Sequence, residues 1–489
     1  MLHIKGINNL GEIKELFAIE AKGAEKILDV FERVFTSIRT CQFDALKKRG
    51  YLPSDILKVL LYLPFLGVST VRGLYQSGCA HLSEAEKNVY YRLKNNSWID
   101  WRSLLLAFAK RFRKLTEQKG ESDSNTKLIR CFDVDDSTCP KRGMKIEFIG
   151  KVFDHTYRQW LLGFKALALA YWDGKSLVPL DFSLHAEKGK NQKRPYGLTL
   201  TQLKKRFSKK RDHKSPAAKR VQELSTNKVN NAISMIKRAV KHGFMADYAL
   251  VDSWFMVHSF ITSIRRIKNG AIHVLGACRM DKRNYLFLGD GKEYTAKELL
   301  NKFKGQKKRS RKVRALYVEL VVSYKGTPVK LFFSRYAGQK KWHLLLTTDL
   351  ELNFNKTIEI YSHRWTIEVM FKEAKQHLNF GKGQANDFDS QIADISISLM
   401  QYIVLVLHKR FTAYESLGAL FRDSKQYFLE TTLAKRLWGF LLQVLREITD
   451  LFEIDLEILM TKMLNDKEHE EKILKVLHAL AQNQPLAVP

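Results

Sequence analysis

The chain of 489 residues has a mass of 56.8 kDa and contains 83 Lys and Arg against 51 Asp and Glu, which gives a net charge of +32. Hydrophobic residues make up 45% of the sequence, which excludes a disordered basic tail and predicts about two to four folded domains. A folded chain with this charge is expected to bind a polyanion. The longest strongly apolar stretch, Ile395 to Leu407, has 13 residues, fewer than the roughly 20 that a membrane span requires.

Short helices are predicted within residues 1–116 from apolar spacing and from a capping box, at Ala21 to Phe35, Ser54 to Leu63, Thr70 to Tyr75 and from Ser83-x-x-Glu86 to Asn95. Short helices joined by tight turns are typical of a helix-turn-helix module. A plain helical bundle fits the same pattern, so both readings stay open.

The polar segment 117–127 is predicted to be a linker, and after it the hydrophobic period becomes that of strands. Three strand regions end near acidic or turn residues: Leu128 to Val134 before Asp135-Asp136, Gln159 to Leu184 with an Asp173-Gly174 hairpin turn, and Tyr248 to Val251 before Asp252. Further strands are expected between Ile272 and Leu346, and helices from Ile358 onward. This order predicts an α/β fold.

Most of the excess charge lies in two segments, 188–220 and 302–341. Each contains 13 Lys and Arg and one acid, so together they carry 24 of the 32 net charges. Such clustering favours a surface that contacts phosphates, although a pair of solvated loops is the alternative. The candidate DNA-binding cations of the first segment are Lys204, Lys205, Arg206, Lys209, Lys210 and Arg211. Residues 447–475 are acidic instead and are predicted to contact protein.

Five polar residues are expected on one edge of a single helix, within about 80° of arc: Tyr361, Arg364, Glu368, Lys372 and Lys375. An apolar stripe should lie beside this edge, formed by Ile367, Phe371, Ala374 and Leu378. A carboxylate in such a setting can bind a metal ion, and the cations beside it can hold phosphates. The alternative is an ordinary surface helix with Arg364–Glu368 and Glu368–Lys372 ion pairs.

One carboxylate is too few for phosphoryl chemistry, and two more candidates follow strands. Asp252 comes directly after Val251, and Asp136 is expected to close the strand that begins at Leu128. Acids at the ends of buried strands are costly unless they are paired or bound to metal. Asp136, Asp252 and Glu368 are therefore the candidate site acids.

The spacing Y-x2-R-x3-E-x6-K, matched by Tyr361, Arg364, Glu368 and Lys375, resembles the signature of DDE transposases of bacterial insertion sequences, in insertion sequence family four. Asp136-Ser137-Thr138 and Val251-Asp252-Ser253 resemble the motifs of the family's two aspartates. The resemblance covers roughly residues 125–410. It favours Asp136 as the first acid because Ser and Thr follow it. Asp135 is the next choice, and strand alternation puts Asp133 and Asp135 on the face opposite Asp136.

The resemblance implies an RNase H-like catalytic core, a mixed sheet flanked by helices, in which Asp136, Asp252 and Glu368 hold two Mg²⁺ ions that Mn²⁺ can replace. Tyr361, Arg364, Lys372 and Lys375 would contact DNA phosphates. Trp342, which lies among cations, would stack on a base flipped from the transposon end, and its alternative role is that of a core tryptophan.

The resemblance also implies a domain order: an N-terminal helical DNA-binding domain (1–116), the linker (117–127), the first part of the core (128–260), a β-rich insertion domain (261–357), the last part of the core with the signature helix (358–410) and a C-terminal helical region for partner contacts (411–489).

The implied activity is cut-and-paste transposition: metal-dependent cleavage of the transposon ends and strand transfer into target DNA, with a DNA hairpin as an optional intermediate. The partners would be double-stranded DNA, both terminal inverted repeats and target, and a second copy of the chain in the DNA complex. The expected location is the bacterial cytoplasm, at the nucleoid, without a membrane. A catalytically inactive DNA-binding relic and an RNase H-like nuclease without strand transfer are the alternatives. A zinc protein is disfavoured because the five cysteines form no ligand spacing.

Overall fold

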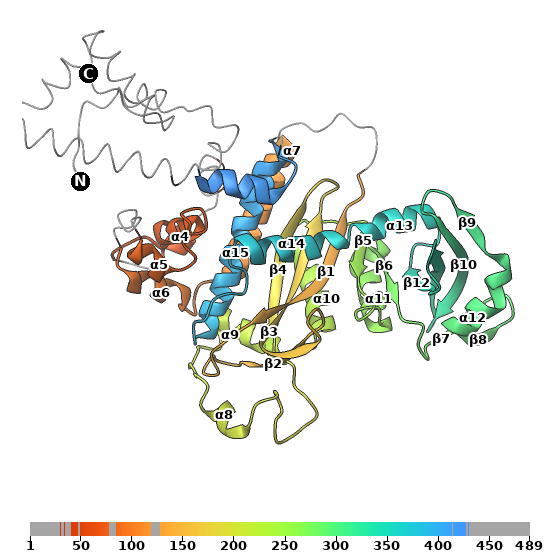
Figure 1. Cartoon of the computed structure of the whole chain (residues 1–489), viewed down its shortest axis with the longest axis horizontal. Helices are drawn as coiled ribbons and strands as arrows, with labels where there is room; N and C mark the ends of the chain where they lie inside the picture. Colours follow the sequence, from red (N-terminus) through yellow and green to blue (C-terminus); the bar gives the residue numbers. More distant parts are fainter. Residues whose placement is uncertain are drawn as a thin grey trace, which may run out of the picture.

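A computed structural model describes residues 41–46, 49–77, 85–118, 128–412 and 414–426, together with the single residues 30, 34 and 429. Several predicted features lie outside the described residues: most of the helix at Ala21 to Phe35, Ser83 of the capping box, nearly all of the linker, the acidic segment 447–475 and most of the C-terminal region. The described part is an α/β structure with one mixed sheet and helices packed on it, so the predicted α/β class is confirmed (Figure 1).

The sheet runs in the order β2-β3-β1-β5-β6-β12-β11-β10-β7-β8, with β4 on β3 and β9 on β10. Its first strands are β1 (Cys131–Pro140), β2 (Gly150–Asp154), β3 (Gln159–Trp172), β4 (Leu177–His185), β5 (Tyr248–Val251) and β6 (His273–Cys278). β3 is antiparallel to β1, β2 and β4, whereas β5 is parallel to both β1 and β6. The carboxyl ends of β1 and β5 therefore point the same way.

The hairpin predicted at Asp173-Gly174 joins β3 to β4 and is confirmed. Gly174 has a φ of 104°, a region open to glycine, and the Asp173 carboxylate accepts hydrogen bonds from the Lys175 and Ser176 amides. The predicted end of the first strand is wrong. β1 continues to Pro140 because its pairing with β3 runs through the acids, Asp135 opposite Ala168 and Asp136 opposite Leu167. Asp136 thus lies inside the strand.

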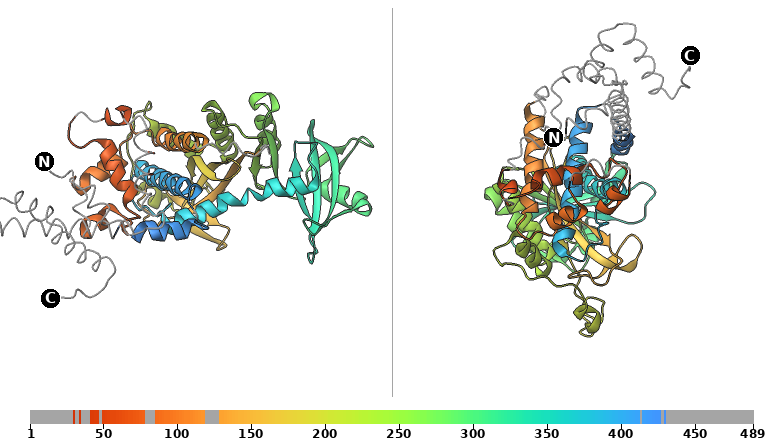
Figure 2. Two further views of the ribbon diagram at one scale, coloured as in Figure 1. Left: turned by 90° about the horizontal axis from the view of Figure 1, so that it is seen from above. Right: turned by 90° about the vertical axis from the view of Figure 1, so that its left-hand side faces the viewer.

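The predicted strands between Ile272 and Leu346 are confirmed. After β6 they are β7 (Asn284–Phe287), β8 (Lys292–Thr295), β9 (Lys308–Ser310), β10 (Ala315–Tyr324), β11 (Thr327–Tyr336) and β12 (His343–Thr347), with α12 (Ala296–Phe303) and the short 3-10 helix η4 (Lys304–Gln306) among them. Another short 3-10 helix, η3 (Ile267–Gly270), precedes β6. β7 to β12 form the lobe on the right of Figure 1 and of the left view in Figure 2. Because β12 pairs with β6, this lobe continues the sheet.

The predicted helices at Ser54 to Leu63 and Thr70 to Tyr75 are confirmed. The N-terminal helices are α3 (Cys41–Asp44), α4 (Pro53–Tyr62), α5 (Val71–Gln76), α6 (Lys87–Lys94) and α7 (Trp101–Gln118). The Thr70 hydroxyl caps α5 by accepting a hydrogen bond from the Gly73 amide. α7 packs against β4 and the C-terminal helix α15 (Phe388–Arg410), which ties this region to the sheet.

Helices cover both faces of the sheet near β1. α8 (Leu200–Lys204), α9 (Pro216–Ser225), α10 (Lys228–Lys241) and α11 (His258–Arg265) come before β6, and α13 (Phe354–Ser362) and α14 (Trp365–His377) come after β12. Asp136 contacts Lys228 at the start of α10, and its neighbour Asp135 contacts Arg364 at the start of α14. Since successive strand residues face opposite sides, α10 and α14 cover opposite faces.

α15 is long and apolar enough to cross a membrane by length and composition, and no other helix in the described ranges meets that test. However, 94% of its most apolar window is buried within the protein. Gln401, halfway along it, donates hydrogen bonds to the carbonyls of Leu60 and Leu61. α15 is therefore packed as a core helix.

Candidate active site

The signature residues meet at the junction of α13 and α14. Tyr361 lies in α13, Arg364 is the cap residue of α14, and Glu368 follows one turn later, so the prediction of a single unbroken helix is wrong. Turns at His363 and Arg364 with hydrogen bonds three residues apart separate the two helices. Tyr361, Arg364 and Glu368 nevertheless lie together, as predicted. Arg364 Nη2 lies 2.6 Å from Glu368 Oε1, and the guanidinium carbon lies 5.7 Å from the centre of the Tyr361 ring.

The predicted apolar stripe holds α14 on the core, because Ile367, Phe371, Ala374 and Leu378 are all buried. Burial of these side chains fixes the rotation of the helix. Glu368 and Arg364 are left on the edge that adjoins β1.

Arg364 links the signature helix to β1. Its Nη1 lies 3.2 Å from Asp135 Oδ2, while its Nη2 holds Glu368. In the parallel pair of β1 and β5, Val134 is opposite Val251, so Asp135 and Asp252 follow side by side. Asp135 and Glu368 therefore share one guanidinium, and Asp252, which follows the neighbouring strand, interacts electrostatically with Asp136 and Arg364.

Asp136 points to the other face and is held by two lysines. Lys228 Nζ lies 2.8 Å from its Oδ2 and Lys165 Nζ lies 3.6 Å from its Oδ1. Lys165 is only 4% exposed, so Asp136 is the carboxylate that neutralises a buried cation. Asp136 still acts electrostatically on Asp252.

The four aspartates differ in pKa. Burial raises the pKa of Asp135 to about 7, and the charges of Asp136 and Asp252 add to this effect. Burial also raises the pKa of Asp252, and it raises that of Asp133 well above its usual range. Burial alone would raise the pKa of Asp136, but Lys228 and Lys165 outweigh it and lower that pKa. The acids on the side of β1 that faces α14 thus have raised pKa values, whereas the pKa of Asp136 on the other side is lowered.

The donors at this edge fit a hard divalent cation. Asp135, Asp252 and Glu368 offer only carboxylate oxygens, which Mg²⁺ prefers, and Oδ1 of the fully buried Asp133 nearby has no hydrogen-bond partner among the described residues. Side chains of the described residues form no ready-made cluster of three metal ligands. The acids would therefore have to close around an ion, with Arg364 released from at least one of them.

The remaining signature cations line the same helix. Lys372 is exposed, whereas burial lowers the pKa of Lys375, which interacts electrostatically with Cys139, Asp154 and Asp136. Trp342 lies away from this cluster, just before β12, where it is half-buried and its ring centre lies 5.4 Å from the Arg335 guanidinium. The structure thus brings Tyr361, Arg364, Glu368 and Lys375 to the sheet edge and leaves Trp342 in the lobe.

The six cations predicted between Lys204 and Arg211 divide into two groups. Lys204, Lys205 and Lys210 are exposed. Lys209 and Arg211 are held by protein carboxylates, with Lys209 Nζ 2.8 Å from Asp389 Oδ2 and Arg211 Nε 2.8 Å from Asp389 Oδ1. Arg211 also pairs with Glu147. Arg206 donates to the carbonyl of Ile149. These last three side chains are engaged within the fold, in contrast to the expected free DNA contacts.

Residues that the sequence pattern missed surround the site. Lys165 and Lys228 hold Asp136, and Trp254, 43% exposed two residues after Asp252, has Lys228 Nζ 5.5 Å from its ring centre. Lys165 lies in a strand and Lys228 at the start of a helix, and neither belongs to a motif with a recognisable spacing. Trp254 could have been noticed in the sequence only because it lies two residues after a candidate acid.

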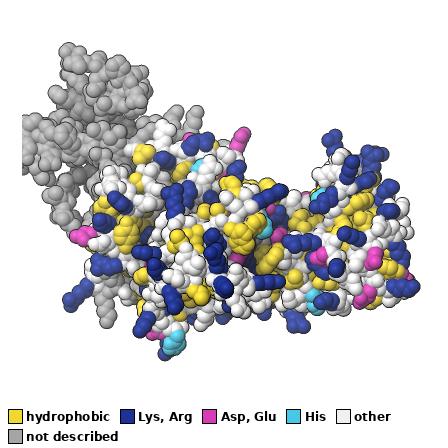
Figure 3. Space-filling model, turned by 60° about the horizontal axis from the view of Figure 1, so that its bottom comes forward, with side chains coloured by type: hydrophobic (Ala, Val, Ile, Leu, Met, Phe, Trp, Pro, Cys, Tyr) yellow, Lys and Arg dark blue, Asp and Glu magenta, His cyan; other side chains and the backbone are white. Residues whose placement is uncertain are grey.

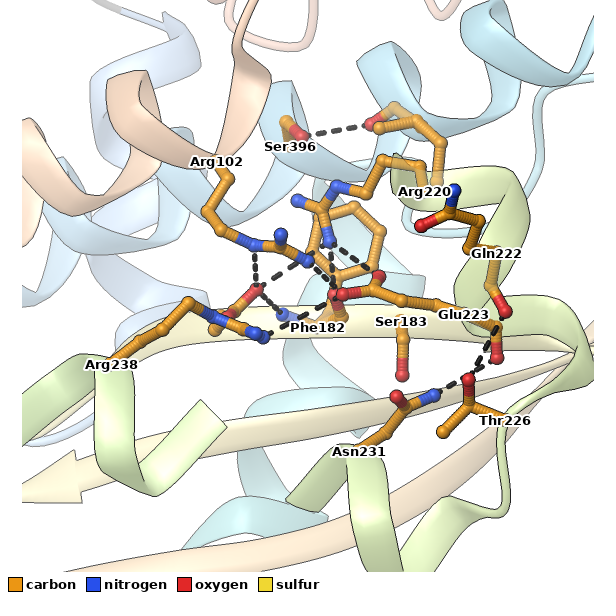
Figure 4. A network of polar contacts seen from close by, with 12 residues as sticks. Arg102, Phe182, Ser183, Arg220, Gln222, Glu223, Thr226, Asn231, Arg238 and Ser396 are labelled. Carbon is orange, nitrogen blue, oxygen red and sulfur yellow. Dashed lines mark hydrogen bonds and ion pairs between the residues drawn. The ribbon is translucent and has the colours of Figure 1, made fainter. Parts of the chain in front are cut away.

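A second polar network lies away from the signature (Figure 4). Asp181 of β4 accepts hydrogen bonds from Arg102 of α7 and Arg238 of α10, and Arg220 of α9 lies 3.5 Å away. Glu223 pairs with the same arginines. The network borders a cavity of about 540 Å³. It joins three helices to the sheet.

A scan against models of known protein families finds no match, and neither does a comparison with curated proteins.

Proposed function

We propose that the chain is a DDE transposase that cleaves transposon ends and transfers the strand into target DNA. The observation that carries the proposal is the bridge from Arg364 to both Glu368 and Asp135, beside Asp252. Three acids from two strands and one helix converge there, at the residues that match the transposase signature. The mixed sheet with helices on both faces supports an RNase H-like core.

Asp135, rather than Asp136, is the first acid that this geometry favours, because Asp136 is occupied by Lys228 and Lys165. Asp135, Asp252 and Glu368 would hold two Mg²⁺ ions, which supply an activated water or 3′-hydroxyl and stabilise the leaving oxygen. Mn²⁺ would fit the same oxygen donors.

The residues of the chain itself position the DNA. Arg364 can bind a phosphate through two parallel hydrogen bonds, and it is already placed between two of the acids. Tyr361 packs beneath this guanidinium and restricts its orientation. Lys375, set into the same helix and partly desolvated, can contact the next phosphate as a point charge. Together they would align the scissile strand with the acids.

The partners would be terminal inverted repeats and target DNA. Cutting two ends in one complex needs two sites, so we infer a homodimer assembled on DNA. The location inferred is the bacterial cytoplasm, at the nucleoid. The exposed face of α6, which carries Lys87, Tyr91 and Arg92, supports a DNA-binding N-terminal domain.

The test is cleavage of the chain's own flanking DNA by purified protein with Mg²⁺, mapping the cut strand, any DNA hairpin and joining to a target plasmid. Asp252→Asn and Glu368→Gln should abolish cleavage and preserve binding to the terminal repeat. Glu359→Gln is the matched control, since Glu359 is a half-exposed carboxylate on α13.

Nicking by either site variant at the wild-type rate would refute the assignment. Wild-type cleavage without joining would identify a nuclease. Specific binding without cleavage by the wild-type protein would identify an inactive relic.

A further inference from the structure

The tip of the β2–β3 hairpin exposes two large aromatic side chains. Tyr157 is 71% exposed and Trp160 is 60% exposed. All six residues from His155 to Trp160 are exposed, and Arg158 has a φ of 51°. Most of the surface of both rings is therefore open to a ligand.

The hairpin is built as a firm support for these rings. The Asp154 carboxylate accepts hydrogen bonds from the Thr156 and Tyr157 amides, which fixes the turn. The Phe153 ring lies 5.5 Å from that of Trp160 and 5.0 Å from that of His155, both edge to face. The turn backbone and the Trp160 ring are therefore held in place before any ligand binds.

A basic loop is fastened to the same hairpin. The Phe153 amide donates to Glu187, and the Lys151 amide donates to the Tyr196 carbonyl, so residues 187–196 lie along β2. Six exposed cations lie on the hairpin and on the loop fastened to it, without an ion-pair partner in the described ranges: Lys151, Arg158, Lys188, Lys190, Lys193 and Arg194. Figure 3, which brings this side of the molecule forward, shows Lys and Arg side chains interspersed with hydrophobic ones.

The turn end of the hairpin adjoins the candidate active site. Asp154 interacts with Thr138, two residues beyond Asp136 on β1, and with Lys375 of the signature helix. A strand held by Arg364, Lys372 and Lys375 would therefore continue along α14 toward Tyr157 and Trp160.

We propose that the β2–β3 hairpin and the 187–196 loop bind unpaired DNA bases, which stack on Tyr157 and Trp160 while the surrounding cations hold the phosphates. Cations that follow a backbone and aromatic rings that accept any base are the features of single-strand binding sites. The identification of this DNA as the strand that extends from the active site rests on the proposed function. The binding itself needs neither cleavage nor metal.

The experiment measures binding of full-length protein in EDTA to three labelled DNAs: a single strand, a duplex with a short unpaired loop, and the same duplex fully paired. Tyr157→Ala/Trp160→Ala should lower affinity for the first two by about tenfold or more, and affinity for the paired duplex by less than about twofold. Tyr157→Phe/Trp160→Phe keeps the rings and should bind like wild type. Leu288→Ala removes a hydrophobic side chain that is 60% exposed in the β7–β8 turn and serves as the control.

Equal losses on paired and unpaired DNA, or no loss at all, would overturn the proposal. Both side chains are exposed, so an unchanged unfolding temperature is expected for the alanine variant. The outcome is separable from the proposed function. If Glu368→Gln cleaves like wild type but the alanine variant loses unpaired DNA, only the transposase assignment fails. If the reverse is found, only the hairpin proposal fails.

Discussion

Two adjacent aspartates in β1 serve opposite faces of the sheet, and this separates their roles. Asp135 faces Arg364 and lies beside Asp252, whereas Asp136 compensates the charges of Lys165 and Lys228. We expect Asp135→Asn to abolish metal-dependent cleavage without lowering the free energy of unfolding. We expect Asp136→Asn to lower that free energy by about 3 kcal/mol, because it leaves a buried lysine unpaired. Cleavage assays and urea unfolding on both variants provide the test.

The opposite result for the two variants would exchange the roles of Asp135 and Asp136. If Asp136→Asn folds with unchanged stability and cannot cleave, while Asp135→Asn cleaves, then Asp136 is the first acid and the Ser-Thr that follows it was the better guide. Lys165→Met with Asp136→Asn removes both members of the pair and should recover much of the stability lost in Asp136→Asn alone.

His185 gives the protein a pH-dependent stability. Its Nε2 lies 2.8 Å from Ser183 Oγ, and burial, followed by the nearby Lys228 charge, lowers its pKa from 6.5 to about 4. The unfolded chain therefore binds more protons below pH 6.5, so this contribution is complete above that pH and is lost as pH falls toward 4. It amounts to at most about 3 kcal/mol.

In His185→Gln, urea unfolding between pH 7.5 and 5 should show a shallower loss of stability than wild type. His213→Gln serves as the control because the His213 side chain is 86% exposed. Identical slopes for wild type and His185→Gln would show that His185 does not carry the effect.

At the scale of elements, the sequence was sufficient to predict those features that depend only on neighbouring residues. The Asp173-Gly174 hairpin, the helix capped by Thr70 and the buried stripe of α14 follow from turn residues, capping and periodicity. The end of β1 was mispredicted because its acids are stabilised by Arg364 and two lysines from distant segments. The break between Tyr361 and Glu368 was missed because helical spacing is almost unaffected by it.

Some residues of the candidate site could likewise be predicted from the sequence, and others could not. Asp252, Glu368 and Arg364 could be found from strand ends and motif spacing. The choice between Asp135 and Asp136 could not, since it depends on which helix covers which face. Lys209 and Arg211 resembled free cations in sequence, but Asp389 and Glu147, which neutralise them, come from other parts of the chain.

The Asp181 network joins α7, α9 and α10 to β4, so a single carboxylate there should stabilise several elements. Arg102, Arg238 and Arg220 outweigh the effect of burial and lower the pKa of Asp181 to about 2. Asp181→Asn leaves three arginines short of one charge and should lower the free energy of unfolding by about 3 kcal/mol. In Asp290→Asn, which breaks an exposed pair with Lys302, we expect a much smaller loss of stability. If Asp181→Asn and Asp290→Asn lower the free energy of unfolding equally, the Asp181 network stabilises the fold no more than an exposed ion pair does.

At the scale of the whole molecule, the count of 83 Lys and Arg overstates the number of cations that would be free to contact DNA. Some of them are paired within the fold: Arg211 and Lys209 hold Asp389, and Arg220 lies against Asp181 and Glu223. In the lobe, Lys308 and Lys330 share Glu319. The cations that remain exposed are the ones that can release counterions from DNA.

This distinction can be measured through the salt dependence of binding. Each exposed cation that contacts a phosphate contributes about 0.9 to the slope of log affinity against log salt. Lys204→Gln/Lys205→Gln/Lys210→Gln should therefore reduce the slope by up to about 3, similarly for any DNA sequence, and leave the unfolding temperature unchanged. Lys209→Gln/Arg211→Gln should instead lower the unfolding temperature, because Asp389 and Glu147 lose their partners. An unchanged slope in the first variant would place that loop off the DNA. A reduced slope with full stability in the second would mean that Asp389 and Glu147 release these cations to DNA.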